Sequence, residues 1–237
     1  MPDERLRHRI HRGATEGTEK TRRKPRVSEG RAWLDTDGCW REASGDLGWA
    51  VGRAALFLDR DGVVVEEVEY LHRAEALALI PGAAELIEEA NRRGIPVVMA
   101  SNQSGIGRGY FGWEQFHQVQ TELKRRLEEA GARVDLTLAC PHYPEHPDRK
   151  PQPGMFCKAG QMAALELGRS WVIGDKASDL EAGRATGLAG GVLVLSGHGA
   201  GHRMAVRGVE TAAFRVVIED SVAGAGWLLD ELAAGRL

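Results

Sequence analysis

From residue 54 onward the chain alternates short apolar runs with longer segments whose apolar residues recur at helical spacing. Short apolar runs bounded by turn residues predict buried strands, and apolar residues three and four positions apart predict helices. Some helical segments also end at a glycine, as in GAAELIEEANRRG, which is a common stop signal. The expected strands cover residues 54–58, 95–101, 134–140, 170–175, 190–197 and 214–218, and the expected helices cover 82–94, 113–131, 155–168, 177–187 and 220–235.

Strands that alternate with helices predict the α/β fold class, with a doubly wound, Rossmann-like parallel sheet and helices on both faces. The connections between these elements leave little room for a separate cap domain. We therefore expect the segments 66–80, 103–112 and 140–153 to shape any ligand pocket.

Residues 1–50 have a different pattern. The segment is rich in Arg, Lys and Glu, contains KTRRKPR at 20–26, and shows no sustained apolar period. It predicts a basic N-terminal arm that is disordered or loosely packed, followed by one α/β domain over residues 51–237. Three tryptophans, Trp33, Trp40 and Trp49, suggest that the later part of the arm packs onto this domain.

Composition narrows the class of protein. The 237 residues are 43% hydrophobic and carry a formal net charge of -3, which gives no support to binding of nucleic acid or of a membrane surface. No apolar run approaches the length of about 20 residues that a membrane span needs. The N-terminus lacks the apolar core of a signal peptide, and three cysteines are too few for a disulfide framework. We expect a cytoplasmic monomer with no membrane partner.

Polar side chains gather where the expected strands end. In an open α/β sheet the ligand crevice lies beyond the carboxyl ends of the strands, so these residues should converge. Clustered carboxylates raise one another's pKa unless a cation is present, and oxygen-rich sites suit Mg²⁺. A carboxylate nucleophile, a carboxyl acid and base, a hard cation and an ammonium group form a set for phosphoryl transfer. The residues concerned are Asp59, Asp61, Ser101, Asn102, Lys150, Asp175 and Asp179.

Four stretches in this order, LFLDRDGVVV, VVMASNQSGIGRG, DRKPQPGM and VIGDKASDLEAG, resemble the four motifs of the haloacid dehalogenase (HAD) superfamily of phosphatases. They are most similar to the branch that contains D-glycero-D-manno-heptose 1,7-bisphosphate 7-phosphatases and histidinol-phosphatases. The resemblance runs from about residue 54 to residue 199.

The resemblance implies the chemical roles at the centre of the site. Asp59 would attack phosphorus and carry an aspartyl-phosphate, and Asp61 would protonate the leaving oxygen and then activate water. Ser101 would hydrogen-bond the phosphoryl group, and Lys150 would neutralise its charge. Mg²⁺ would be held by Asp59, by the backbone carbonyl of Asp61 and by Asp175.

The resemblance also implies a set of substrate contacts around this centre. These residues lie in the loops that follow the first, second and fourth expected strands and beside Lys150. They are Glu67, Tyr70, Asn102, Gln103, Ser104, Arg149 and Lys176.

The substrate implied by the resemblance is a small phosphorylated metabolite, specifically the 7-phosphate of a heptose 1,7-bisphosphate. Histidinol phosphate is the first alternative, and another sugar phosphate or a nucleotide is the next. A binding protein that no longer turns over substrate, and a phosphatase whose nucleic-acid substrate is recruited by the basic arm, stay open. Deleting residues 1–50 separates the last of these, because that enzyme would lose salt-sensitive binding.

The stretch CPHYPEHPDRKPQPG at 140–154 departs from many relatives, in which a CxH pair and a later CxC pair hold zinc. Here Cys140 and His142 form the CxH pair, but EHPD stands where the second pair should be. His146 or Cys157 could add a ligand, yet a structural zinc needs four. We expect a shortened, metal-free loop stiffened by prolines.

A second DxDG pattern occurs in LDTDGCW at 34–40. It lacks a full apolar strand before it, so we interpret it as a polar turn and expect mutation of Asp35 to leave activity intact.

Overall fold

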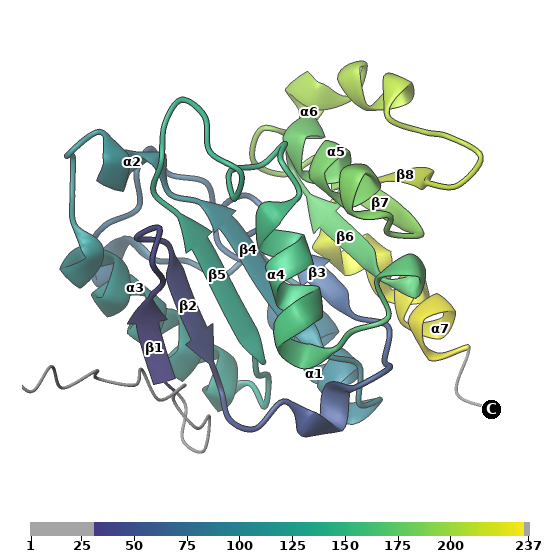
Figure 1. The fold of residues 1–237 in the computed structure, drawn as a ribbon, viewed down its shortest axis with the longest axis horizontal. Helices are drawn as coiled ribbons and strands as arrows, with labels where there is room; N and C mark the ends of the chain where they lie inside the picture. The colour runs from purple at the N-terminus through teal and green to yellow at the C-terminus, as the bar shows by residue number, and fades with distance from the viewer. Residues whose placement is uncertain (1–30, 235–237) are drawn as a thin grey trace, which may run out of the picture.

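The computed structural model describes residues 31–234 and contains one mixed, mostly parallel sheet (Figure 1). The strands are β1 (Arg31–Leu34), β2 (Trp40–Ala43), β3 (Leu56–Leu58), β4 (Val97–Asn102), β5 (Leu136–Cys140), β6 (Trp171–Gly174), β7 (Gly190–Val194) and β8 (Arg215–Glu219). The helices are α1 (Ala83–Arg92), α2 (Ser104–Gly107), α3 (Trp113–Glu129), α4 (Gly154–Ala163), α5 (Ala177–Thr186), α6 (Gly199–His202) and α7 (Leu228–Ala233). Each strand expected from residue 54 onward is present.

The strands lie in the order β1-β2-β5-β4-β3-β6-β7-β8. The six strands from β5 to β8 in this order are parallel, with β3 near the middle, where Leu58 pairs with Met99 and with Ile173. The chain crosses over on both sides of β3, and this is the doubly wound arrangement predicted from the sequence. The α/β fold class is confirmed.

The two faces of the sheet carry separate cores. Along β3, Leu56 and Leu58 pack into the core under α1, α3 and α7, whereas Phe57 packs on the other face with α4 and α5. Phe57 meets Phe156 of α4 at a ring distance of 4.8 Å. Because β3 is covered on both faces, all three of its residues are apolar, and the first polar residue along it marks the edge of the sheet.

The structure differs from the expected N-terminal arm over residues 31–50. Strands β1 and β2 form a hairpin, and β2 pairs antiparallel with β5, so this segment is part of the sheet. The side chains of Arg41 and Glu42 are buried and satisfied by ion pairs, Arg41 with Asp148 and Glu42 with Lys124. An apolar pattern cannot reveal a strand that buries charged pairs, which is why the hairpin was not expected.

The second DxDG pattern forms the turn of this hairpin. The Asp35 carboxylate accepts the backbone N–H groups of Asp37 and Cys39, each at 3.0 Å. The interpretation as a polar turn therefore agrees with the structure. KTRRKPR lies outside the described residues, and a truncation that tests this basic segment without cutting the sheet ends at residue 30.

The helix expected over residues 220–235 is shorter than its pattern suggested. Val222–Trp227 forms a 3₁₀ turn, and the α-helix begins at Leu228. Two glycines in VAGAGW lower helix propensity in that stretch. Within residues 31–234 no helix combines the length and the apolar character required to cross a bilayer.

Candidate active site

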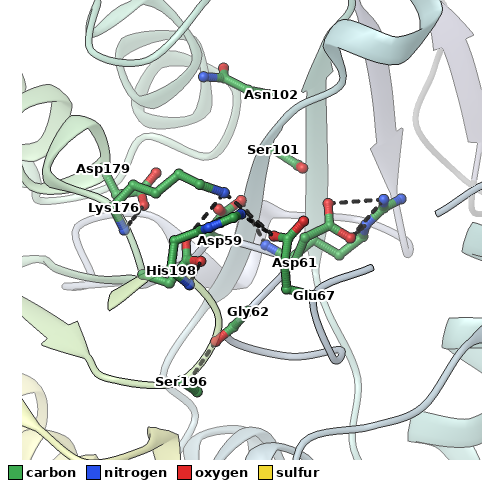
Figure 2. Close-up of polar contacts among 12 residues, drawn as sticks. Asp59, Asp61, Gly62, Glu67, Ser101, Asn102, Lys176, Asp179, Ser196 and His198 are labelled. Carbon is green, nitrogen blue, oxygen red and sulfur yellow. Dashed lines mark hydrogen bonds and ion pairs between the residues drawn. The ribbon is translucent and has the colours of Figure 1, made fainter. Parts of the chain in front are cut away.

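A cavity of about 260 Å³ opens at the carboxyl ends of the central parallel strands, where the sequence placed the site (Figure 2). Two of the three segments expected to shape the pocket line it, through Glu67–Leu71 and through Gln103–Gly105 with Phe111. The third, residues 140–153, contributes Lys150. Lys176 and Asp179, which the sequence placed at the site, also line the cavity, together with Ser178 and His198, which were not expected there.

Lys150 forms the centre of the charged floor of this cavity. Its side chain is 3% exposed, and its ammonium contacts Asp59 Oδ1 at 2.9 Å, Asp179 Oδ1 at 2.6 Å and the carbonyl of Ala100 at 2.7 Å. Burial alone would lower the pKa of Lys150, but the charges of Asp179 and Asp59 outweigh it and the net shift is upward. The lysine is therefore a fixed positive charge beside Asp59.

Asn102, at the end of β4, fixes the backbone of Lys150. Its amide donates to the carbonyl of Lys150 at 2.9 Å and accepts the N–H of Lys150 at 3.0 Å. This pair of bonds joins the 141–153 loop to the central sheet. Asn102 lines the cavity as expected, but in this structure its polar atoms position Lys150.

Asp61 is neutralised separately from Asp59. Its carboxylate accepts hydrogen bonds of 2.9 to 3.1 Å from the buried guanidinium of Arg60. It also accepts a hydrogen bond from Gln103 Nε2 at 3.1 Å. The same Gln103 nitrogen lies 2.8 Å from Ser101 Oγ. The charges of Asp59 and Asp61 are thus compensated by two different cations, Lys150 and Arg60.

Asp175 has the character of a cation ligand. It is completely buried, its Oδ2 accepts the N–H of His198 at 2.9 Å, and its Oδ1 accepts no hydrogen bond. Burial and the nearby charge of Asp59 raise its pKa to about 7. The carboxylates of Asp59, Asp175 and Asp179 place oxygens within 4.8 Å of one another. Such an oxygen-rich, under-neutralised cluster fits a hard divalent cation.

The turn that follows Asp61 is shaped to approach Asp175. Gly62 has φ of +82°, and a Cβ there would lie 2.4 Å from Asp175 Oδ2. The carbonyl of Gly62 accepts the hydroxyl of Ser196 at 2.7 Å, which ties this turn to the end of β7 (Figure 2). A glycine is therefore required for both the backbone conformation and the close approach.

Glu67, Lys176 and His198 form one wall of the cavity (Figure 2). Glu67 Oε2 lies 3.4 Å from Lys176 Nζ and 3.6 Å from His198 Nε2, and Lys176 Nζ lies 3.6 Å from Asp175 Oδ1. Although burial opposes it, the charges of Asp59, Asp175 and Glu67 raise the pKa of Lys176. This wall can present an ammonium group to an anionic substrate.

Of the remaining predicted contacts, Tyr70 and Ser104 line the cavity. Arg149 is not among the residues that line it, and its guanidinium lies 5.3 Å from the ring of Tyr143. Arg108 covers the same ring at 3.6 Å. Sequence reasoning gave Arg60 and Arg108 no role of their own and interpreted His198 as a surface residue, because an arginine between two aspartates and polar residues in glycine-rich loops are ordinary surface patterns.

Residues 148–219 match the family model described as HAD-hydrolase-like. A crystal structure from Mesorhizobium loti, described as a HAD-like phosphatase, superposes with a TM-score of 0.76 at 36% identity, over 86% of this chain and 97% of that one. The chain is a phosphatase of this superfamily and acts on phosphomonoesters.

More specific relatives are also similar. A D-glycero-beta-D-manno-heptose-1,7-bisphosphate 7-phosphatase from Mesorhizobium japonicum is 44% identical over 170 residues, covering 68% of this chain and 78% of that protein. The D,D-heptose 1,7-bisphosphate phosphatase of B. bronchiseptica, crystallised with magnesium and phosphate, matches with a TM-score of 0.67 and 29% identity, over 74% of this chain and 97% of that one. The chain belongs to the family of the D-glycero-D-manno-heptose-1,7-bisphosphate 7-phosphatases.

Proposed function

We propose that this protein removes the 7-phosphate of a D-glycero-D-manno-heptose 1,7-bisphosphate, with Asp59 as nucleophile and Mg²⁺ as cofactor. The observation that carries the proposal is the contact between Asp59 and the buried ammonium of Lys150 beside the carboxylates of Asp175 and Asp179. The proposal includes a cytoplasmic, monomeric enzyme.

The reaction follows from the positions of these groups. An oxygen of Asp59 attacks phosphorus while the bond between phosphorus and the sugar oxygen breaks, and Asp61 gives its proton to that leaving oxygen. Asp61 then takes a proton from water, whose oxygen attacks the aspartyl-phosphate and releases inorganic phosphate. Asp59 returns as a carboxylate, so atoms and charges balance over the two steps.

Charge stabilisation is the main requirement of phosphoryl transfer. Lys150 supplies a fixed positive charge on one side, and Ser101 supplies a hydroxyl from the end of β4. Asp59, Asp175 and the backbone carbonyl of Asp61 would hold Mg²⁺, which supplies charge neutralisation to the phosphoryl oxygens when bound.

Two arginines close in sequence to cavity-lining residues favour a bisphosphate. Arg108 follows the cavity-lining residues Ser104 and Gly105, Arg149 precedes Lys150, and both guanidiniums lie against the ring of Tyr143. A sugar with its reacting phosphate at Asp59 could direct a second phosphate toward these guanidiniums, which suit bidentate contacts to phosphate. Glu67, which lines the cavity, can accept hydrogen bonds from sugar hydroxyls.

We expect one substrate to stand far above the rest when phosphate release is measured with and without Mg²⁺. The panel holds both anomers of heptose 1,7-bisphosphate, the 7-monophosphate, histidinol phosphate, common sugar phosphates and nucleotides. A bisphosphate should exceed the monophosphate by about tenfold or more in kcat/KM, because one charge-assisted contact to the second phosphate contributes about 1.5–3 kcal/mol.

Two results would contradict this substrate. A preference for histidinol phosphate would move the chain to the alternative branch, while leaving the chemistry at Asp59 unchanged. No release from folded, Mg²⁺-binding protein would favour a binding protein on the same fold.

Mg²⁺ should stabilise the protein more strongly as the pH rises. In the metal-free protein the pKa of Asp175 is about 7, above its ordinary value of 3.8. The folded state therefore holds a proton that the unfolded state releases, and the resulting stability is lost as pH rises toward 7. Mg²⁺ must replace that proton, so its affinity should fall as pH drops below about 7.

Melting temperatures with EDTA and with Mg²⁺, measured across this pH range, test the sign. Asp175→Asn should lose most of the Mg²⁺ effect, and Asp175→Ala should raise the Mg²⁺ requirement for turnover sharply. Asp220→Asn, at an exposed position after β8, is the matched control and should behave as wild type. An unchanged Mg²⁺ response in Asp175→Asn would place the cation elsewhere.

A further inference from the structure

A buried arginine holds the carboxylate of Asp61. Arg60 is 1% exposed, and its Nε and one terminal nitrogen contact both carboxylate oxygens of Asp61 at 2.9 to 3.1 Å. Within residues 31–234 this guanidinium forms an ion pair with no other carboxylate. Its second terminal nitrogen has no hydrogen-bond partner in the same part of the chain. The buried charge of Arg60 is therefore directed at one carboxylate.

Net stability is a weak reason for this arrangement. The side chain of Asp61 is 16% exposed and lines the cavity, so water can reach its carboxylate. The guanidinium of Arg60 loses its hydration on burial, and a buried ion pair adds little or nothing to net stability. A buried cation paired with a carboxylate that faces the ligand cavity favours a role in the reaction.

The position of Arg60 is fixed at its backbone and at its guanidinium. The carbonyl of Arg60 accepts the N–H groups of Val64 and Val65 at 2.9 and 3.0 Å, which closes a tight turn. The guanidinium lies 5.4 Å from the ring centre of Phe116 on α3, which is completely buried. A cation over an aromatic face is attracted to the ring. The planar guanidinium is thereby held, and it holds both oxygens of Asp61 in turn.

A second contact relates Asp61 to the end of β4. Gln103 is 4% exposed, and its Nε2 lies 3.1 Å from Asp61 Oδ2 and 2.8 Å from Ser101 Oγ. The resemblance implied a substrate contact for Gln103, and in this structure its amide joins Asp61 to Ser101. Asp61 is thus held at a set position relative to the hydroxyl that we propose binds the phosphoryl group.

We propose that Arg60 is a positioning residue that holds Asp61 where it can exchange protons with the leaving oxygen and with water. The proposal rests on the proposed role of Asp61 as acid and base. Asp61 becomes a carboxylate when it gives its proton to the sugar oxygen that leaves phosphorus, and the guanidinium of Arg60 stabilises this charge. In the second step the same carboxylate takes a proton from the attacking water. Arg60 itself exchanges no proton.

The leaving group of the substrate separates this role from a general loss of structure. A sugar phosphate releases an alkoxide, which needs a proton, whereas p-nitrophenyl phosphate releases a phenolate that leaves without one. For the sugar phosphate that wild-type protein hydrolyses fastest, Arg60→Met should lower kcat by about 10²-fold, the lower end of the range for acid–base catalysis. KM should change little, and the first turnover of p-nitrophenyl phosphate should keep its wild-type rate.

The second step gives another signature. Attack of water on the aspartyl-phosphate needs a base, whichever substrate formed this intermediate. Arg60→Met should therefore release a burst of p-nitrophenol and then turn over slowly. Asp61→Asn should show the same pattern with a larger loss. The double variant Arg60→Met/Asp61→Asn should be no slower than Asp61→Asn, because Arg60 acts through Asp61.

Two further variants control for folding. Arg60→Lys keeps the buried charge, but an ammonium lacks the planar fork that contacts both carboxylate oxygens. Its loss should be smaller, with the same difference between the two substrates, and it decides the case if Arg60→Met does not fold. Arg133→Met is the matched control, since Arg133 pairs at 2.9 Å with the buried Asp135 just before β5, outside the cavity. It should equal wild type on both substrates.

Three results would overturn the proposal. Equal first-turnover losses on both substrates in Arg60→Met, or losses that add to those of Asp61→Asn, would show a structural role alone. A higher KM at unchanged kcat would make Arg60 a substrate contact. Equal first-turnover losses on both substrates in Asp61→Asn would show that Asp61 is not the acid, and would refute the proposed mechanism together with the role of Arg60.

Discussion

Asp59→Asn should abolish phosphate release, with a fall in kcat of about 10⁴-fold or more, the scale on which hydrolases lose rate without their nucleophile. The amide keeps the shape of the side chain, which is 6% exposed at the end of β3. It cannot form the aspartyl-phosphate, and it replaces the carboxylate that contacts Lys150 at 2.9 Å. Burst kinetics and trapping of a covalent phosphoenzyme should fail together with steady-state turnover.

The matched control is Asp37→Asn, the second acid of the DxDG pattern in the hairpin turn. It is exposed and lies outside the cavity, so its kcat should equal that of the wild type. Melting temperatures should show that both variants are folded. Appreciable Mg²⁺-dependent release by Asp59→Asn would remove Asp59 as the nucleophile.

The positions of the central acids could be predicted because they depend on strand ends. Buried strands β3, β4 and β6 have a clear apolar signature. Asp59 and Asp175 directly follow β3 and β6, and Ser101 is the last residue but one of β4. Parallel pairing then brings these residues to one edge of the sheet. Such an inference needs only the alternation of elements and the identity of the residue that ends each strand.

Other features of the site depend on side-chain partners that a linear pattern does not contain. Arg60 gives no apolar or motif signal, yet it neutralises Asp61 and is itself 1% exposed. Asn102 bonds to the backbone of Lys150 from a position far away in sequence. His198 reaches the cavity because the segment after β7 turns back beside Asp175, to whose carboxylate its N–H donates.

The hairpin shows the same limitation on a larger scale. In WREA all four residues of β2 are buried, although two of them are charged. Pairing of Arg41 with Asp148 and of Glu42 with Lys124 makes this burial tolerable, and both partners come from later parts of the chain. Sequence periodicity identifies strands that bury apolar side chains. It does not identify a strand whose buried side chains are charged and form ion pairs with residues far away in sequence.

Lys150→Met should reduce both activity and stability, because the buried ammonium of Lys150 forms ion pairs with two buried carboxylates. Its loss leaves Asp59 and Asp179 without their shared cation. Breaking a buried pair by removing one partner costs about 3–5 kcal/mol of unfolding free energy. Loss of a fixed charge at the phosphoryl group should lower kcat by about 10²- to 10³-fold.

The pH dependence separates this electrostatic cause from a packing defect. Burial already raises the pKa of Asp179, and Lys150 opposes that rise. Without Lys150 the pKa of Asp179 should increase further, so the folded variant holds a proton that the unfolded chain releases. The stability deficit relative to wild type should therefore grow as pH rises above the ordinary carboxyl range and shrink below it. A deficit that does not change with pH would indicate lost packing alone.

A double variant then assigns the deficit to its source. Adding Asp179→Asn to Lys150→Met removes one of the two uncompensated carboxylates, so it should recover part of the lost stability. It should recover no activity, since the charge beside the phosphoryl group is still missing. Lys124→Met, which breaks the partly exposed pair with Glu42, is the matched control and should keep wild-type kcat. Recovery of turnover in the double variant would show that Lys150 acts only by neutralising Asp179, and the phosphoryl charge would then have to be met by Lys176, the other ammonium that lines the described cavity.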